Sequence, residues 1–598
     1  MNKLQEAFHR MKRRSTYAAT AAGAIAALLI SACSSSGSSS GGTPSNTAGT
    51  SGYNAGLSKV VNPSSAKGGT LTMALSAAPD SFDGGNTYYA WVLDFNNLYQ
   101  MPLFMYQACP GTCSAKLVPN LAADMGTTSD NGLTWTFHIK PNVKYEDGTV
   151  VTAQDVKYAI ERTYDRSVMA NGPTYYQVIL TDPKYPGPYK DRAKNLMGLS
   201  AIQTPDATTL VFHLQSAFPD LPYVLAFPST APVPPSKDTG SNYQLHPMST
   251  GPYKFQSYQL NKQLTLVPNT NWNPATDPTA KQLLSKIVVN LNVNQADVDN
   301  RLLAGDIALD TQGTGVAAAA QARILANPNL KANADNPFTG RAWFAYLNTK
   351  VAPMNNLHCR EAVEYAANKT DMQTAWGGPV AGGQIASTLM VPVIAGYKSF
   401  DLYNALSQPT GDLTSAKQQL TQCGQPNGFS TNLSYRSDRP KETAAATAIQ
   451  ASLKRVGINV TLKGFPSGSY YTNFAGAPAY VHSHNIGIAM GGWSADWPNG
   501  YGFLDSLVAG NTIVSTGNTN IAELNDPVIN NLFKKSNTIT GDARTAIWSQ
   551  IDMQTMKDAA VLPMVYARSL DYRSPKLTNA YIYDQFGMYN YAVLGMQS

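Results

Sequence analysis

The sequence predicts a mixed α/β protein that folds into two or more lobes. Removal of an N-terminal leader of 32 residues leaves 566 of the 598 residues, which exceeds the length that one hydrophobic core usually serves. Strand-like and helix-like patterns alternate along the chain instead of forming separate blocks, as in α/β proteins. No internal repeat occurs, and no run of eighteen apolar residues follows the leader.

The leader resembles a bacterial lipoprotein signal. Five basic residues precede an apolar run from about Ala18 to Ala32, and small residues stand directly before Cys33. A helix of about fifteen residues rises only about 22 Å, less than a bilayer core of about 30 Å. We therefore predict that residues 1–32 are a cleaved signal peptide and that Cys33 carries a lipid, which holds the protein on the outer face of the cell membrane. Ordinary secretion and an uncleaved membrane anchor are the alternatives.

Residues 33–62 are predicted to form a tether. Sixteen of the nineteen residues from Ser34 to Gly52 are Ser, Gly or Thr, a composition that cannot bury a core. The leader carries five positive charges and one negative charge, so its removal lowers the net charge from +6 to +2. This balance argues against nucleic acid as a partner. The 32 tyrosines and 8 tryptophans fit either ordinary packing or an aromatic-lined ligand cleft.

Periodicity predicts the local elements. Thr70–Leu75 is a plausible first strand, and apolar residues alternate with polar ones over Leu133–Lys140. Asp147-Gly148 indicates a turn, after which Thr152 and Asp155 have the spacing of a capping box before a helix. Two further helices are predicted at Cys359–Lys369 and about Thr414–Cys423.

Four cysteines remain after Cys33, in a compartment that permits disulfides. Cys109 and Cys113 enclose a turn-forming Pro-Gly-Thr triplet, and a bridge between Cys359 and Cys423 would stabilise the fold by about 4 kcal/mol on the chain-entropy model. Other pairings remain possible from the sequence.

No metal or cofactor site is predicted. Gly313–Ala318 matches a loose dinucleotide fingerprint but lacks a convincing acidic residue about twenty positions further on. His482 and His484 lack a third ligand nearby, and we find no nucleophile and base for a hydrolase. We therefore do not predict an enzyme; a surface hydrolase and a passive structural lipoprotein are the rival hypotheses from other classes.

Nine segments together resemble the extracellular solute-binding proteins of family 5, the peptide, oligopeptide and nickel receptors of ABC importers. They occur in order over about residues 68–572: Trp135–Lys140, Tyr145–Thr149, Thr152–Tyr158, Thr250–Tyr253, Asn269–Trp272, Leu303–Ile307, Tyr346–Thr349, Arg360–Ala366 and Gly491–Asp496.

The resemblance implies a periplasmic-binding-protein-like fold, in which two α/β lobes close like a clam (type II, large cluster) and lobe I carries an extra subdomain. The implied divisions are lobe I at 63–105, 236–335 and 563–598, subdomain Ib at 106–235, and lobe II at 336–562. The two crossings between lobes are expected near Ala334–Asn348 and Val561–Tyr572.

The resemblance also implies a ligand site at Gly491–Asp496. In peptide-binding members an aspartate of this motif meets the ammonium of the ligand and the preceding tryptophan lines the cleft, positions that Asp496 and Trp493 match. Asp496 could instead cap a helix containing Phe503 and Leu504, and Trp493 could lie in the core. Many relatives have Asp-Pro where this chain has Asn499-Gly500, which weakens any inference about ligand charge.

Further candidate ligand contacts come from two other segments. Arg436 and Arg439 are candidates for meeting a ligand carboxylate. Tyr88, Tyr89 and Trp91 follow a loop that reaches the cleft in relatives, although aromatic clusters more often serve packing.

The predicted function is a monomeric, lipid-anchored receptor that captures a small-molecule or peptide ligand and delivers it to an ABC permease and its ATPase. An oligosaccharide or a metal chelate is the alternative ligand.

Overall fold

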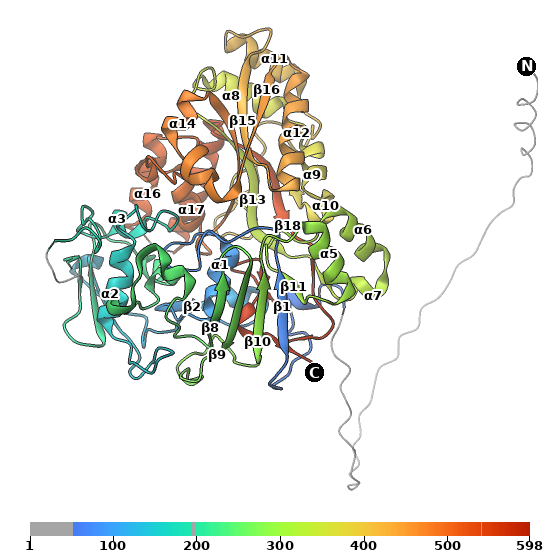
Figure 1. The fold of residues 1–598 in the computed structure, drawn as a ribbon. Helices are drawn as coiled ribbons and strands as arrows, with labels where there is room; N and C mark the ends of the chain where they lie inside the picture. Colours follow the sequence, from blue (N-terminus) through green and yellow to red (C-terminus); the bar gives the residue numbers. More distant parts are fainter. Residues whose placement is uncertain (1–51, 193–197, 540, 598) are drawn as a thin grey trace, which may run out of the picture. The chain divides into compact units, whose positions relative to one another are not determined.

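The computed structural model describes residues 52–192, 198–539 and 541–597. The predicted signal peptide, Cys33 and the tether up to residue 51 lie outside the described residues. The described residues form one compact unit. Its architecture is organised by two large mixed sheets and one smaller antiparallel sheet (Figure 1).

The first large sheet defines lobe I and has the strand order β11-β1-β10-β9-β8. Strand β1 pairs in parallel with β10 and β11, whereas β9 runs antiparallel to both β10 and β8. The strands are β1 (Thr70–Ala74), β8 (Tyr253–Gln259), β9 (Gln263–Pro268), β10 (Lys286–Asn290) and β11 (Leu309–Asp310). The helices of this part are α1 (Ala90–Phe95), α5 (Gln295–Ala304), α6 (Ala318–Ala326) and α7 (Pro328–Lys331).

Subdomain Ib is built on the four-stranded sheet β4-β5-β7-β6, whose pairs are all antiparallel. These strands are β4 (Thr127–Ser129), β5 (Thr134–His138), β6 (Ile202–Gln203) and β7 (Thr209–His213). The pair β2 (Phe104–Tyr106) and β3 (Leu117–Pro119) precedes them, and the helices are α2 (Ala153–Arg162), α3 (Tyr175–Ile179) and α4 (Leu221–Val224).

Lobe II is built on the six-stranded sheet β14-β18-β13-β17-β15-β16. Its strands are β13 (Phe338–Leu347), β14 (Gln384–Ile385), β15 (Ser430–Arg436), β16 (Asn459–Phe465), β17 (Ile486–Ser494) and β18 (Val561–Arg568). Its helices are α8 (Leu357–Ala366), α9 (Lys369–Trp376), α10 (Gly378–Ala381), α11 (Leu413–Gln422), α12 (Pro440–Lys454), α13 (Ser467–Ser469), α14 (Pro478–Ser483), α15 (Gly500–Val508), α16 (Pro527–Ser536) and α17 (Gly541–Lys557).

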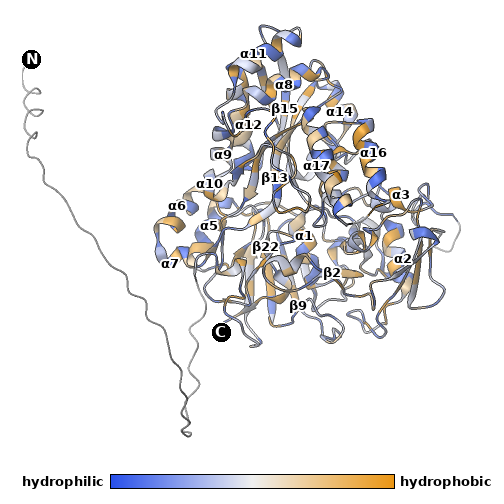
Figure 2. Cartoon of the chain, turned by 180° about the vertical axis from the view of Figure 1, so that it is seen from behind, coloured by the Kyte–Doolittle hydropathy of each residue, from blue (hydrophilic) through white to orange (hydrophobic). Residues whose placement is uncertain are grey.

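Helices cover both faces of the lobe II sheet, as the alternation along β13 shows. Trp343, Ala345 and Leu347 belong to the core beneath α8, α9, α11 and α12. Phe344 and Tyr346 point to the opposite face, into the core that holds α15, α16 and α17 (Figure 1). Figure 2 shows hydrophilic and hydrophobic residues side by side on α12 and α16, as expected for helices with one face on a sheet and one face in water.

The chain passes between the lobes through two neighbouring segments. β12 (Ala334–Asp335) pairs with β19 (Asp571–Tyr572), directly beside the start of β13 and the end of β18. The chain then returns to the lobe I core through β20 (Leu577–Thr578), β21 (Ile582–Tyr583), β22 (Met588–Tyr589) and β23 (Gly595–Met596). β18 keeps the chain in the lobe II sheet up to Arg568, six residues beyond the boundary expected at residue 562.

The end of the predicted tether differs from the expectation. Residues 52–62 pack on the folded body: Ala55–Leu57 form a 3-10 helix, and Gly56 N–H donates to Asp335 Oδ1 at 2.9 Å. Val61 is 1% exposed and forms a β-bridge with Ala580. The Ser/Gly/Thr composition ends at Gly52, so the apolar side chains that follow it bind the body, and the prediction of a tether up to residue 62 extends too far.

The local sequence signals agree with the observed elements. α2 begins at a capping box in which Thr152 N–H donates to Asp155 Oδ2 at 2.9 Å. The predicted strands at 70–75 and 133–140 appear as β1 and β5. The predicted helices at 359–369 and 414–423 appear as α8 and α11, shifted by one to three residues.

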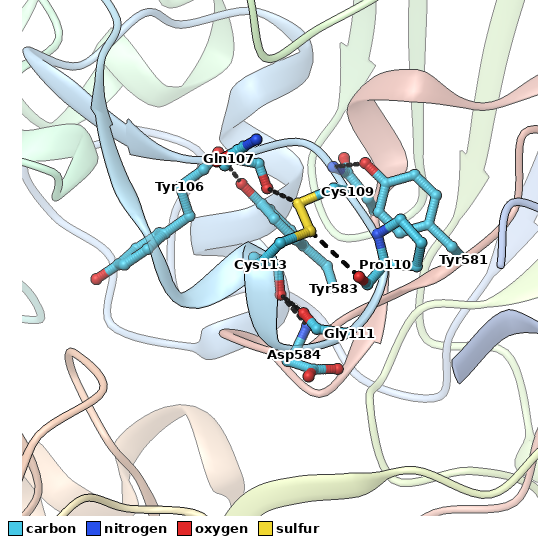
Figure 3. Close-up of a disulfide and its surroundings, with 11 residues drawn as sticks. Tyr106, Gln107, Cys109, Pro110, Gly111, Cys113, Tyr581, Tyr583 and Asp584 are labelled. Carbon is cyan, nitrogen blue, oxygen red and sulfur yellow. Dashed lines mark hydrogen bonds between the residues drawn. A yellow bond between two sulfur atoms is a disulfide. The ribbon is translucent and has the colours of Figure 1, made fainter. Parts of the chain in front are cut away.

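The structure contains the Cys109–Cys113 and Cys359–Cys423 disulfides. The second joins α8 to the end of α11, and Cys359 is fully buried in the core of lobe II. Figure 3 shows the first, in a loop held by the C-terminal return: Tyr583 Oη donates to Tyr106 O at 2.5 Å, and Asp584 N–H donates to Ser114 Oγ at 3.1 Å. Within the described ranges, no helix combines the length and the apolar character that a membrane crossing requires.

Candidate ligand cavity between the lobes

A cavity of about 210 Å³ lies where lobe I, subdomain Ib and lobe II meet. Lobe I supplies the segment around α1, subdomain Ib supplies residues near α2 and α3, and lobe II supplies the ends of β13, β15 and β17. All seven residues predicted to contact a ligand line it: Tyr88, Tyr89, Trp91, Arg436, Arg439, Trp493 and Asp496.

Asp496 follows β17 and points at two tyrosines of the opposite side. Its Oδ2 accepts hydrogen bonds from Tyr88 Oη at 2.6 Å and from Tyr175 Oη. Burial raises the pKa of Asp496 to about 7, against the opposing effect of these two hydrogen bonds. No Lys, Arg or His of the described ranges forms an ion pair with it. The carboxyl is therefore suited to accept a cation that the protein does not itself provide.

The alternative that Asp496 caps a helix does not apply. α15 begins after Asn499, whose side-chain oxygen accepts the N–H of Gly502 at 3.0 Å and so performs the capping role. Asp496 instead belongs to the cavity wall, and its own N–H donates to Gly502 O at 2.9 Å.

The Gly-Gly-Trp sequence before Asp496 has a steric explanation. A Cβ on Gly492 would lie 2.1 Å from the ring of Trp343, and one on Gly491 would lie 2.5 Å from Tyr346, so only glycine fits at either position. Trp493 lies half-buried and meets Tyr88 edge to face, with the ring centroids 5.6 Å apart. This aromatic pair forms the wall of the cavity beside Asp496.

The other end of the cavity is basic. Arg341 comes from β13, Arg436 ends β15 and Arg439 precedes α12. Arg436 forms an ion pair with Glu442 at 2.6 Å. Burial, together with the positive charges of Arg439 and Arg436, lowers the pKa of Arg341 to about 10.

Arg341 and Arg439 are held by neutral partners. Arg341 Nε donates to Ser494 Oγ at 3.1 Å, and its guanidinium lies over the ring of Trp343. Arg439 Nε donates to Ser467 Oγ at 3.1 Å, and its guanidinium lies over Tyr89. Among the described residues, neither has a carboxylate at ion-pair distance. This end of the cavity therefore favours an anion.

The aromatic residues predicted to contact the ligand differ in how much of each side chain faces the cavity. Tyr88 contacts Asp496 directly, and Tyr89 Oη donates to Ser467 O at 3.2 Å across the lobes. Trp91 borders the cavity but is only 6% exposed and packs on Phe82 and Phe95, so most of its ring belongs to the lobe I core.

Sequence reasoning missed three important residues. Arg341 is a charged residue inside an otherwise apolar strand, a signal that was available. Tyr175 reaches Asp496 from subdomain Ib, 321 positions away in the chain, and no local pattern marks it. Asp505 lies in α15, where burial raises its pKa to about 7.

A second contact between subdomain Ib and lobe II lies outside this cavity. Asp220 accepts hydrogen bonds from Arg544 Nη1 and Nη2, at 2.8 and 2.9 Å, and from Trp497 Nε1 and Asn499 Nδ2, both at 3.1 Å. Trp497 is fully buried there, stacked between Tyr223 and Tyr501. The lobes are thus closed on each other in this structure.

Comparison with known proteins places this geometry in a family. The pattern of the bacterial extracellular solute-binding proteins, family 5, matches residues 116–514, well over half of the chain. This protein belongs to that family. The two closed lobes with an inserted subdomain are accordingly a periplasmic-binding-protein fold.

Several members are similar over most of this chain. The oligopeptide-binding protein 2 of clavulanic acid biosynthesis is 36% identical, covers 93% of this chain and 100% of its own, and superposes with a TM-score of 0.85. The peptide-binding protein DppA of Helicobacter pylori, in complex with the peptide STSA, is 22% identical over 89% of this chain and 99% of its own, with a TM-score of 0.72.

Curated relatives give the same assignment. The probable D,D-dipeptide-binding periplasmic protein DdpA of Escherichia coli is 26% identical over 445 residues, or 72% of this chain and 76% of that protein. The periplasmic oligopeptide-binding protein OppA of Escherichia coli is 24% identical over 458 residues, with the same coverage. The chain is therefore an extracytoplasmic solute-binding protein.

Proposed function

We propose that this protein binds peptides with a free amino terminus and delivers them to the permease of an ABC importer. The observation that carries the proposal is the polarity of the cavity. Asp496 faces it without a cationic partner, and Arg341 and Arg439 face it without an anionic one. A peptide supplies both missing charges at its two ends, and its backbone adds hydrogen bonds that do not depend on sequence.

The proposed binding roles follow from these contacts. The ligand's ammonium pairs with Asp496, beside the rings of Tyr88 and Trp493. Its carboxylate meets the arginines at the opposite end. Ligand bridges the lobes and stabilises the closed arrangement, which the permease then recognises. The protein performs no chemistry on its ligand.

We also propose that Cys33 is lipidated and that the protein acts as a monomer on the outer face of the membrane. A lipid and a flexible tether would keep the receptor at high local concentration beside its permease. Labelling cells with an alkynyl fatty acid tests this assignment: the wild-type protein should carry the label, and the Cys33→Ala variant should not. Equal labelling of the two would contradict it.

Native mass spectrometry of the purified protein, followed by identification of any retained ligand, tests the peptide assignment. Isothermal titration calorimetry with Ala-Ala-Ala and its N-acetylated form then tests the role of the ammonium. We expect only the free-amine peptide to bind well. Recovery of a sugar or a metal chelate, or equal affinity for the two peptides, would contradict the proposal.

A further inference from the structure

A second, smaller chamber continues from the basic end of the main cavity. Its volume is about 70 Å³, and it shares four lining residues with the main cavity: Gln312, Arg341, Trp343 and Arg439. A single water molecule needs about 10–15 Å³ on this measure, so the chamber has room for a small polar group. The shared residues make it an extension of the ligand cavity and not a separate site on the surface.

The chamber is strongly cationic. Four of its lining residues are basic: Arg341, Arg439, Lys441 and Arg568. The one acidic residue that lines it is Glu442, which is already paired with Arg436.

Lys441 has local compensation. Its Nζ donates to Thr314 O at 2.9 Å, and the carboxyl groups of Asp571, Asp299 and Asp310 raise its pKa, against the larger lowering effect of burial. Among the described residues, no carboxylate lies at ion-pair distance from any of the three arginines. Arg568 Nη1 donates to the backbone oxygen of Asn336 at 3.1 Å, and its guanidinium lies over the ring of Phe338.

The charges that line the main cavity and the chamber indicate what kind of ligand can occupy them. Arg341, Arg439 and Arg568 bring three positive charges to the chamber, and none forms an ion pair with a carboxylate of the described ranges. All three are partly buried, and this burial lowers the pKa of each of them. One ligand carboxylate would balance only one of the three.

We propose that the chamber is a subsite for a second negative charge, so that the preferred ligands are peptides whose last residue is Asp or Glu. The main-chain carboxylate then lies at the basic end of the main cavity, and the side-chain carboxylate of the same residue enters the chamber between Arg341 and Arg568. This inference rests on the proposed peptide-binding function and narrows it to one class of peptide.

Calorimetry with the isosteric pair Ala-Ala-Glu and Ala-Ala-Gln tests the inference. The two peptides differ in one charge at nearly constant shape. Because hydrogen bonds to charged groups contribute more than neutral ones, we expect Ala-Ala-Glu to bind about tenfold more tightly or better.

Substitution of Arg568 sharpens the test, because this residue lines only the chamber. Arg568→Gln should bring the ratio of the affinities for Ala-Ala-Glu and Ala-Ala-Gln close to one, whereas Arg568→Lys should retain part of the preference. Arg323→Gln is the matched control, because Arg323 is exposed on α6 and its Nη1 donates to Asn300.

The outcomes separate the two proposals. If the wild-type protein binds both peptides equally, or prefers Ala-Ala-Gln, the acidic subsite is wrong while the peptide receptor stands. If it binds neither peptide, both are wrong. The comparison of the two peptides on the wild-type protein is enough to distinguish these outcomes, so the test does not depend on the folding of any variant.

Discussion

Asp220 and Asp496 both join subdomain Ib to lobe II, but their partners differ in kind. Asp220, only 3% exposed, accepts four N–H groups from lobe II, two of them from the guanidinium of Arg544. Asp496 accepts only the neutral hydroxyl groups of Tyr88 and Tyr175. A buried carboxylate with a complete set of donors serves structure, whereas one without a countercharge is prepared for a ligand.

Removal of the charge at Asp496 tests the ligand side of this comparison and should have the largest effect. Asp496→Asn retains the shape of the side chain but cannot balance an ammonium, so the affinity for Ala-Ala-Ala should fall by about 100-fold or more. Calorimetry measures the change, and the N-acetylated peptide is the control because its affinity should not depend on the charge. Unchanged affinity for Ala-Ala-Ala would show that Asp496 does not meet the ammonium.

Removal of the charge at Asp220 tests the structural side. Asp220→Asn leaves Arg544 without its anion between the lobes, and we expect the free energy of unfolding to fall by about 3 kcal/mol. Thermal unfolding of the unliganded protein measures this as a lower melting temperature.

Asp496→Asn should not lower that temperature, because a carboxyl with a raised pKa is itself costly to bury in its charged form. Asp306→Asn, at an exposed position after α5, controls for the loss of one negative charge. If Asp496→Asn lowered the stability more than Asp220→Asn, the assignment of Asp220 to structure and Asp496 to ligand binding would be wrong.

The pH dependence of binding separates the two carboxyl groups further. The pKa of Asp496 is about 7, so acid protonates it, and a bound ammonium requires the ionised form. The affinity for Ala-Ala-Ala should therefore be greatest between pH 7 and pH 8, because the ligand's amine loses its charge above a pKa of about 8, and it should fall severalfold from there to pH 6. Calorimetry across this range measures the slope, which Asp496→Asn should abolish and Asp220→Asn should retain.

The tyrosines at Asp496 should have the smallest effect. Tyr175→Phe removes one of the two hydroxyl donors that lower the pKa of Asp496, so the midpoint of the binding profile should move to higher pH. The affinity at pH 7 should fall only severalfold, since a rise of one unit in the pKa of Asp496 lowers the ionised fraction at pH 7 about fivefold. Tyr176→Phe is the control, because that hydroxyl contacts Ser229 at 3.0 Å. An identical profile for both variants would exclude Tyr175 from the site.

The sequence predicted the parts of the fold that local patterns determine. The capping box at Thr152 and the alternation through Trp135 and Phe137 depend on neighbours in the chain, and both appear as expected. The order of strands in the sheets does not follow from such patterns, because β13 lies between β17 and β18, strands that follow it by more than a hundred residues.

The residues of the candidate site were likewise predictable only where they lie close together in the sequence. Motif resemblance led to Trp493 and Asp496, since they lie within one short segment. The partners that define the chemistry, Tyr175 for Asp496 and Arg341 for the basic end, come from distant elements. The end of the tether was misjudged because its composition changes at Gly52, whereas Val61 packs on Ala580 near the other end of the chain.

Because Trp497 is buried between the lobes, its fluorescence should report whether the lobes are closed or open. Its indole ring is fully buried between Tyr223 of subdomain Ib and Tyr501 of lobe II, and its N–H donates to Asp220. Separation of these surfaces exposes the ring to water and breaks that hydrogen bond, so the fluorescence of this one tryptophan moves to longer wavelength as the lobes part. The difference spectrum between the wild-type protein and Trp497→Phe thus provides an intrinsic gauge of opening that needs no attached dye.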